Sequence, residues 1–228
     1  MSASSRPRSA GHRAAARAPT GFDHAFRDRL RDLLLWRRDV RRFRSDPLPG
    51  GTLEALIELA CLAPSVGLSQ PWRFVIVEDA MRREAVQRNF ATCNAAALAA
   101  QQHERAGRYA RLKLAGLAEA PCHLAVFADR GTAQGHGLGR HTMPEMIEYS
   151  VVTAVHTIWL AARAQDIGMG WVSILDPLAV ADILAVPREW KFIGYFCLGY
   201  PQTGDTVPEL EQSGWERRRL PGSVVIRR

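Results

Sequence analysis

The sequence lacks the patterns that bind metal ions or cross a membrane. None of its seven histidines is spaced as HxxxH or HExxH, and none of its four cysteines forms a CxxC pair, so no metal site is predicted. No stretch reaches the roughly 18 apolar residues of a transmembrane helix, and the first twenty residues have no apolar signal-peptide core. We therefore expect a cytoplasmic protein with no membrane partner and with buried, reduced thiols at Cys61, Cys93, Cys122 and Cys197.

Acidic side chains are missing from residues 1–20, which hold four arginines. Five more arginines, at 217–219, 227 and 228, lie at the other end, so most of the net charge of +7 is terminal. Terminal charge without a recognisable motif is weak evidence for nucleic-acid binding, and no nucleic-acid partner is predicted. Residues 1–22 are predicted to be a disordered basic arm, with an organelle transit peptide as the alternative, and residues 23–228 a single domain.

Hydrophobic patterning predicts an α+β fold. Apolar residues at helical spacing indicate helices over 23–36, 144–167 and 178–184, one capped by Thr52 and ended by Pro64, and another capped by Asp79. Residues 91–118 read as two helices separated near 103–107 and form a candidate lid. Short runs that are apolar on both faces indicate central strands: Trp72–Val77, Leu124–Ala128, Met169–Leu175 and Phe192–Leu198. The helices and strands alternate along the chain in a way that fits one sheet covered by helices.

Three further segments have unusual composition. The helix over 144–167, predicted to be the longest and to stop at Gly168, has little polar surface, so it is either buried centrally or part of a subunit interface. Residues 202–228 cannot form a core and must lie across another surface. The loop 129–142 holds four glycines, but their spacing matches no phosphate loop, and it is interpreted as a mobile connection.

A basic cluster follows the first predicted helix. Arg37, Arg38 and Arg41 surround Asp39 directly after an apolar run. Guanidinium groups are planar, permanently charged and matched to phosphate oxygens, so an arginine cluster at a helix end predicts an anion site. The alternative is a solvated surface cluster in which Asp39 pairs with its neighbours.

Several motifs in one order resemble the FMN-dependent nitroreductase-like family. The resemblance covers roughly residues 25–218 and rests on the following segments: Arg37–Phe43, Ala63-Pro64-Ser65, Ser69–Trp72, Gly168–Trp171 and Gly199-Tyr200-Pro201. It implies a central, mostly antiparallel sheet flanked by helices. It also implies a homodimer with two sites at the interface, and a C-terminal segment, residues 202–228, that wraps onto the partner.

Departures from the family pattern indicate a flavin-destroying member. Asp39 stands where a Ser is usual, and Leu68 where an Asn is common. Such members consume reduced FMN and O2 and release 5,6-dimethylbenzimidazole, the lower ligand of cobalamin. FMN is then a substrate, supplied in reduced form by a separate flavin reductase. A conventional NAD(P)H-dependent nitro or quinone reductase, or a nucleic-acid module using the basic ends, are the alternatives.

The resemblance also assigns roles to individual residues. Asp39 is the expected base or proton shuttle. Ser173 is expected to donate a hydrogen bond to the flavin where O2 adds. Tyr109 is expected in the lid. The other expected flavin-binding residues are Arg37, Arg38, Val40, Arg41, Pro64, Ser65, Lys113, Gly170, Trp171, Val172 and Arg217. Pro64 and Ser65 are expected to reach the partner's flavin, and the nearest alternative for Asp39 is a structural ion pair.

Overall fold

The computed structural model describes residues 21–228, so the predicted arm, residues 1–22, lies almost wholly outside the described residues. Four strands form one antiparallel sheet in the order β1-β2-β4-β3. Their bounds are β1 Trp72–Ile76, β2 Cys122–Asp129, β3 Gly168–Val172 and β4 Trp190–Gly199. The predicted antiparallel sheet is confirmed, and each expected strand is present with its ends shifted by at most three residues.

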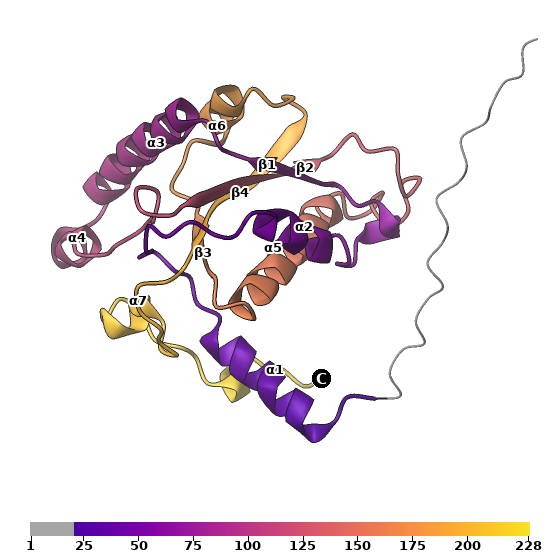
Figure 1. Cartoon of the computed structure of the whole chain (residues 1–228), viewed down its shortest axis with the longest axis horizontal. Helices are drawn as coiled ribbons and strands as arrows, with labels where there is room; N and C mark the ends of the chain where they lie inside the picture. Colours follow the sequence, from indigo (N-terminus) through magenta and orange to yellow (C-terminus); the bar gives the residue numbers. More distant parts are fainter. Residues whose placement is uncertain (1–20) are drawn as a thin grey trace, which may run out of the picture.

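Helices cover both faces of the sheet, which explains why its strands carry apolar residues on both faces. Within β2, Leu124 and Val126 belong to the core cluster on one face, and Ala125 and Phe127 to the cluster on the other. Helices α2 (Thr52–Ala60) and α5 (Met146–Arg163) lie on the first face, and α3 (Ala80–Ala99) and α6 (Pro177–Leu184) on the second (Figure 1). A sheet buried on both faces cannot show the alternation of polar and apolar residues.

Helix α5 is central, as its composition predicts, but it is not the longest helix. Seven of its residues are buried, among them Val151, Val155 and Ile158. It spans 18 residues, whereas α3 spans 20. The predicted stop at Gly168 is also wrong, because α5 ends at Arg163 and Gly168 is the first residue of β3.

Three further local features differ from the sequence-based prediction. Thr52 does not cap α2; the cap is Gly51, at φ 81°, and the helix ends at Ala60, before Pro64. The break in the candidate lid falls between α3 and α4 (His103–Ala110), at residues 100–102, so Gly107 lies inside a helix. Cys61 is exposed instead of buried, while Cys197 is buried and the other two are half-buried.

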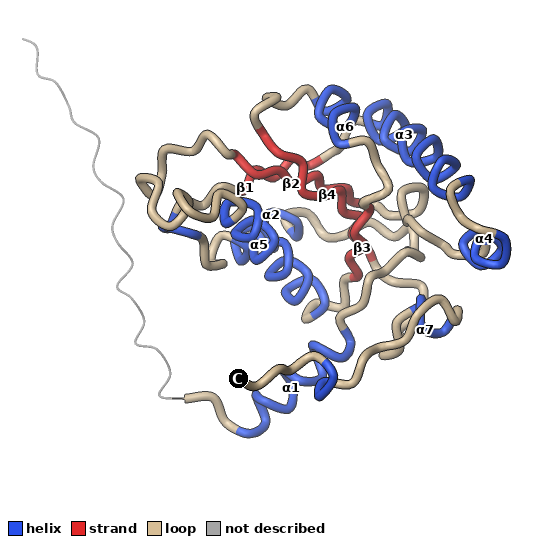
Figure 2. The backbone as a smooth tube through the Cα atoms, turned by 180° about the vertical axis from the view of Figure 1, so that it is seen from behind, coloured by secondary structure: helices blue, strands red, loops and turns tan. Residues whose placement is uncertain are grey.

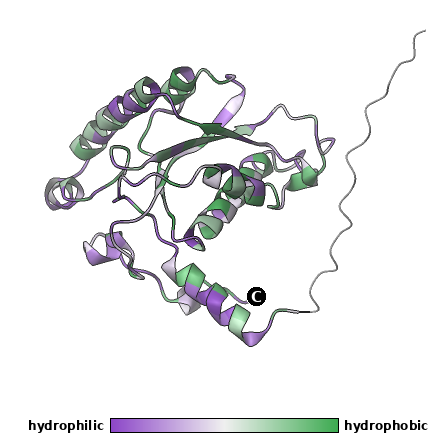
Figure 3. Cartoon of the chain, in the orientation of Figure 1, coloured by the Kyte–Doolittle hydropathy of each residue, from purple (hydrophilic) through white to green (hydrophobic). Residues whose placement is uncertain are grey.

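Helix α1 (His24–Trp36) and the C-terminal segment lie outside the two layers (Figures 1 and 2). No residue of α1 is buried, although five large apolar side chains on it are 40–46% exposed. These are Phe26, Leu30, Leu34, Leu35 and Trp36. Figure 3 shows hydrophobic residues gathered in the sheet and in α2 and α5, with further hydrophobic stretches on α1. Among residues 21–228, no helix is long and apolar enough to cross a membrane.

Candidate active site

The arginine-rich segment after α1 lies along the open edge of β3. Arg37 caps the helix, with its N–H donating to Leu33 O at 2.8 Å. Val40 N then donates to Met169 O at 3.0 Å, and Asp39 pairs with Met169 in a parallel bridge. The sheet edge therefore fixes the backbone of the predicted flavin motif.

Two glycines of β3 leave the space that the backbone of residues 39–41 occupies at the sheet edge. A Cβ on Gly170 would lie 2.0 Å from Val40 O, and a Cβ on Gly168 would lie 2.9 Å from Val40 Cγ2. Both distances are shorter than real Cβ contacts, so any side chain at either position would displace residues 39–41. The Gly-x-Gly spacing that resembles a flavin-binding strand thus has a structural cause within the chain.

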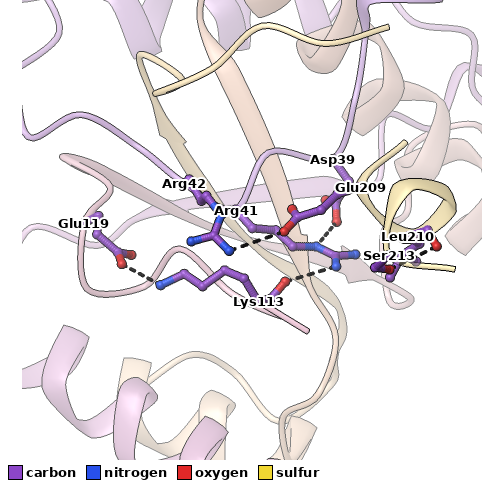
Figure 4. Close-up of polar contacts among 8 residues, drawn as sticks. All are labelled: Asp39, Arg41, Arg42, Lys113, Glu119, Glu209, Leu210 and Ser213. Atoms are coloured by element: carbon purple, nitrogen blue, oxygen red, sulfur yellow. Dashed lines mark hydrogen bonds and ion pairs between the residues drawn. The ribbon is translucent and has the colours of Figure 1, made fainter. Parts of the chain in front are cut away.

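The Asp39 carboxylate is held at both oxygens. Trp171 N donates to Oδ1 at 2.8 Å. Arg41 Nε donates to Oδ2 at 2.7 Å, as Figure 4 shows. The side chain remains 30% exposed. A carboxylate with two fixed donors has one orientation, and its exposed side is available to a ligand.

Arg41 and Lys113 connect this carboxylate to a distant segment. Arg41 Nη1 donates to Lys113 O at 3.1 Å, and the Lys113 ammonium pairs with Glu119 at 2.5 Å (Figure 4). The Lys113 side chain is thus engaged within the chain, although sequence resemblance assigns it to the flavin. The neighbouring Arg42 points elsewhere and pairs with Glu209 at 3.6 Å.

Arg37 and Arg38 form a cationic cluster against α5. The Arg37 guanidinium stacks 4.9 Å from the ring of Trp159, whose Nε1 donates to Arg38 O at 3.0 Å. The Arg38 side chain donates to Arg37 O and to Thr206 O. Burial, and then the charge of Arg218, lower the pKa of both guanidiniums from the usual value.

This cluster has the electrostatics of an anion site. Arginine keeps its proton, and burial and the charge of Arg218 disfavour the two guanidiniums more than the carboxylates of Asp39, Asp205 and Glu211 favour them. A cavity of about 310 Å³ adjoins it, and its lining consists of residues 38–42 with Thr203, Asp205, Val207, Glu209 and Gln212. The sequence pointed to Arg217, which is exposed and whose own N–H donates to Glu216. The structure instead places Arg218 near the cluster, a residue that nothing in the sequence distinguishes from its neighbours.

Pro64 and Ser65 lie away from this cluster within one chain. Pro64 O accepts from Thr153 and Val66 N donates to Ser150 Oγ, so the loop packs beside the first half of α5. The arginines contact Trp159, nine residues after Ser150, which corresponds to about 13 Å along a helix. The chain alone does not bring these predicted site residues together.

Ser173 directly follows β3 and is exposed, and its side chain forms no hydrogen bond with the rest of residues 21–228.

Tyr109, on the candidate lid, is buried. Its hydroxyl donates to Asn94 Oδ1 at 2.8 Å, and its ring meets Trp215 edge-on at 6.2 Å. A hollow of about 830 Å³ separates the α3–α4 turn from Trp215. Val172 is buried in β3, and Trp171 packs on Phe196.

The Gly-rich loop 129–142 is packed onto the loop that contains Pro64. Gln134 Nε2 donates to Leu68 O at 2.8 Å, and a Cβ on Gly135 would lie 2.6 Å from Gly67 O. The approach of Gly67 thus accounts for Gly135, and a Cβ on Gly139 would likewise lie 2.8 Å from Val66 Cγ2. No group of three His, Cys, Asp or Glu side chains within the described chain is placed to hold a metal ion.

Comparisons with known proteins give the same family that the sequence motifs indicate. The model of the nitroreductase family matches residues 34–200. A 5,6-dimethylbenzimidazole synthase of Rhodospirillum rubrum is 57% identical over 206 residues, which cover 90% of this chain and 97% of that one. A 5,6-dimethylbenzimidazole synthase of Rhodobacter capsulatus is 45% identical over 195 residues, covering 86% and 94%.

A solved structure shares the fold at lower sequence identity. Iodotyrosine deiodinase, bound to FMN and 3-iodo-L-tyrosine, superposes with a TM-score of 0.68 at 24% identity, covering 87% of this chain and 97% of that one. The predicted resemblance is confirmed, including the flavin-destroying branch indicated by Asp39. The chain belongs to the nitroreductase family.

Proposed function

We propose that this protein is a 5,6-dimethylbenzimidazole synthase, which uses O2 to fragment reduced FMN to 5,6-dimethylbenzimidazole, the lower ligand of cobalamin. The observation that carries the proposal is the 57% identity over almost the whole length of a relative of that name. Asp39, at the position where a Ser is usual in the family, supports the same branch. FMN is therefore a substrate, and a separate flavin reductase supplies it in reduced form.

The arginine cluster fits the phosphate of FMN. Burial, and then the nearby charge of Arg218, lower the pKa of Arg37 and of Arg38, so three guanidiniums lie close together. A phosphate dianion relieves this repulsion and accepts charge-assisted hydrogen bonds. Reduced FMN, when bound, supplies the electrons that O2 accepts. The chain supplies orientation, exclusion of water and proton transfer.

Asp39 is proposed as the base that removes protons during fragmentation. Its two fixed donors aim the carboxylate, and its exposed side faces the cavity lined by residues 38–42. Breaking carbon–nitrogen and carbon–carbon bonds of a flavin requires proton removal, which a positioned carboxylate performs. Lys113 and the backbone of Gly170–Val172 are proposed to line the ring.

Ser173 is proposed to donate a hydrogen bond near the atom at which O2 reacts. Its side chain is exposed beyond the end of β3 and is not engaged by the rest of residues 21–228. A neutral hydroxyl stabilises developing negative charge on oxygen when it is held within hydrogen-bond distance. Helices α3 and α4 are proposed to form the lid that keeps water out.

A homodimer is proposed to complete each site. Helix α1 exposes five large apolar side chains, and Leu220, Val224, Val225 and Ile226 of the tail are each at least 60% exposed. An apolar surface of this kind is typical of an interface. A second copy also accounts for Pro64 and Ser65, which lie away from the arginine cluster within one chain.

Product analysis distinguishes synthase from reductase. Purified protein is mixed with reduced FMN in air, and 5,6-dimethylbenzimidazole is quantified by mass spectrometry. In parallel, the protein is given oxidised FMN, NADH or NADPH, and a quinone. The proposal predicts 5,6-dimethylbenzimidazole in the first reaction and no nicotinamide oxidation in the second. Nicotinamide oxidation without 5,6-dimethylbenzimidazole would support the conventional reductase.

A further inference from the structure

Trp215 joins the C-terminal segment to the candidate lid. Its ring meets the ring of Tyr109 on α4 edge-on, with the two centroids 6.2 Å apart. Tyr109 is 8% exposed, and its hydroxyl donates to Asn94 Oδ1 on α3 at 2.8 Å. Aromatic rings at this distance and angle attract each other beyond the effect of the area that they bury. Trp215 therefore contacts a tyrosine that ties the two lid helices together.

A tight turn fixes Trp215 relative to helix α7 (Glu209–Gln212). The turn contains Gly214, which has the left-handed φ of 69°. Beyond it, Trp215 N donates back to Leu210 O at 2.9 Å. A glycine in this conformation, followed by a hydrogen bond back into the helix, is a common way to end a helix. The backbone of Trp215 thus moves together with α7.

Helix α7 is in turn attached to the arginine-rich segment that follows α1. Glu209 pairs with Arg42 at 3.6 Å, and Arg38 Nε donates to Thr206 O, just before α7, at 2.8 Å. The path from the predicted phosphate site to the lid is therefore short. It runs from Arg38 through α7 to Trp215 and then to the tyrosine on α4.

The turn between the two lid helices stands apart from the C-terminal segment. A hollow of about 830 Å³ separates them, and its lining includes Gln101, Glu104 and Arg108 of the lid together with Trp215. Closely packed elements leave no space of this size. The ring contact with Tyr109 supports the lid at the edge of this hollow, so a shift of Trp215 changes the support of the lid.

The chain that follows Trp215 leads directly to the arginine cluster. Three residues later comes Arg218, which is exposed and whose charge, after burial, lowers the pKa of Arg37 and of Arg38. Like charges repel, so Arg218 is drawn toward the other two arginines only when an anion lies between them. A phosphate dianion attracts all three guanidiniums and favours the arrangement in which residues 215–218 lie against the cluster.

We propose that Trp215 is a positioning residue through which the phosphate of the flavin fixes the lid, so that the site selects FMN over riboflavin in turnover as well as in binding. The phosphate draws Arg218 inward, and the ring three residues earlier is thereby held against Tyr109. Riboflavin has no phosphate and leaves this support loose. The inference rests on the proposed function and on the lid proposed for α3 and α4, and it names how that site recognises a phosphorylated substrate.

The first test divides the substrate into two pieces. Each protein receives reduced riboflavin in air, with or without inorganic phosphite, a small dianion that mimics the phosphate group, and 5,6-dimethylbenzimidazole is quantified. Binding energy from a remote group can be used to raise turnover. We expect phosphite to raise the turnover of wild type by on the order of tenfold. Trp215→Phe keeps a ring against Tyr109 and should respond similarly, whereas Trp215→Ala should lose the response.

Leu178→Ala is the matched control. It also removes a large exposed apolar side chain, but from α6, and should respond to phosphite as wild type does.

Amide hydrogen exchange measures the lid without turnover. Wild type and Trp215→Ala are compared with saturating oxidised FMN and with saturating oxidised riboflavin. In wild type, FMN should slow the exchange of α4 more than riboflavin does. In Trp215→Ala this difference should vanish, while the affinity for FMN should fall by less than about tenfold, because no charge-assisted contact with the phosphate is removed.

Two results would overturn the inference. One is a wild-type response of Trp215→Ala to phosphite together with a retained difference in exchange, because the phosphate would then act without Trp215. The other is a wild type that does not respond to phosphite and whose α4 is protected equally by FMN and riboflavin, a result that needs no variant to fold. If wild type formed no 5,6-dimethylbenzimidazole from reduced FMN, the proposed function would fail, while the exchange of α4 would still decide whether the phosphate acts through Trp215.

Discussion

The two residues proposed to act on the flavin lie along β3 but are held in opposite ways. Asp39 is fixed by a backbone N–H of the strand and by an arginine, and that arginine is fixed by a second segment. Ser173 follows the last residue of the strand, is exposed and has no partner among the other described residues. A base that must remove a proton in one direction benefits from fixed geometry. A hydroxyl that donates to an oxygen atom on which negative charge develops benefits from freedom to rotate toward that atom.

Replacing the fixed residue should have the largest effect. Asp39→Asn keeps the size of the side chain and an acceptor for Trp171 N, but its amide cannot act as a base. We expect formation of 5,6-dimethylbenzimidazole to fall by on the order of 10²–10⁴-fold, with reduced FMN still bound and reoxidised. Product and peroxide are measured together. Formation of 5,6-dimethylbenzimidazole at near the wild-type rate would mean that Asp39 is only a structural partner of Arg41.

Replacing the free residue should have a smaller effect on a different step. Ser173→Ala removes one donor and no packing, so we expect turnover to fall by on the order of 10²-fold with the melting temperature unchanged. Stopped-flow spectra should show the reaction with O2 impaired in Ser173→Ala and retained in Asp39→Asn. The reverse pattern would exchange the two proposed roles.

Replacing Arg38 in the arginine cluster should have a third, smaller effect, which is confined to ligand binding. Arg38→Ala should weaken FMN binding by about 1.5–3 kcal/mol, the value of a hydrogen bond to a charged group, and leave riboflavin binding nearly unchanged. Because Arg38 also donates to Thr206 O, Arg42→Ala serves as the control, since it removes a different contact with the C-terminal segment. Equal weakening of FMN and riboflavin by Arg38→Ala would argue against a phosphate contact.

The buried His123, which is hydrogen-bonded to Tyr195 and to Ala120 O, should make the fold sensitive to acid. Burial, and then the charge of Arg83, lower the pKa of His123 to about 4, so His123 stays neutral in the fold while the unfolded chain takes up a proton near pH 6.5. The unfolded state then binds more protons between these values, and stability falls as the pH falls. His123 should contribute a loss of about 2 kcal/mol between pH 7 and pH 5.

Urea unfolding at both pH values measures this contribution. His123→Phe removes the titrating group, so the difference between its unfolding free energies at pH 7 and pH 5 should be smaller than that of wild type. An unchanged difference would show that other groups set the acid sensitivity.

The sequence predicted the sheet and the position of the flavin motif because both leave local patterns. Continuous apolar runs marked β2 and β4, and the arginines around Asp39 marked the helix end. Arg38 and Asp39 line one cavity, and Arg37 and Arg38 belong to one cationic cluster. Their roles toward a flavin stay predictions.

The remaining site features depend on contacts between residues far apart in the sequence. Gly168 fits a helix stop, a position where glycine is common, but the approach of Val40 is the reason that a glycine stands there. Arg41 donates to a backbone carbonyl 72 residues away, and such a bond leaves no trace in the sequence. Arg218 lies in a tail without periodicity, so only the fold distinguishes it from Arg217.

Labelling of the flavin tests the central claim, that FMN is consumed as a substrate. The protein is mixed in air with reduced FMN carrying carbon-13 throughout the ribityl chain, and the product is analysed by mass spectrometry. The account predicts 5,6-dimethylbenzimidazole with a single labelled carbon, between its two nitrogens, since the ribityl chain supplies that atom. Quantitative recovery of intact FMN without any 5,6-dimethylbenzimidazole would contradict it.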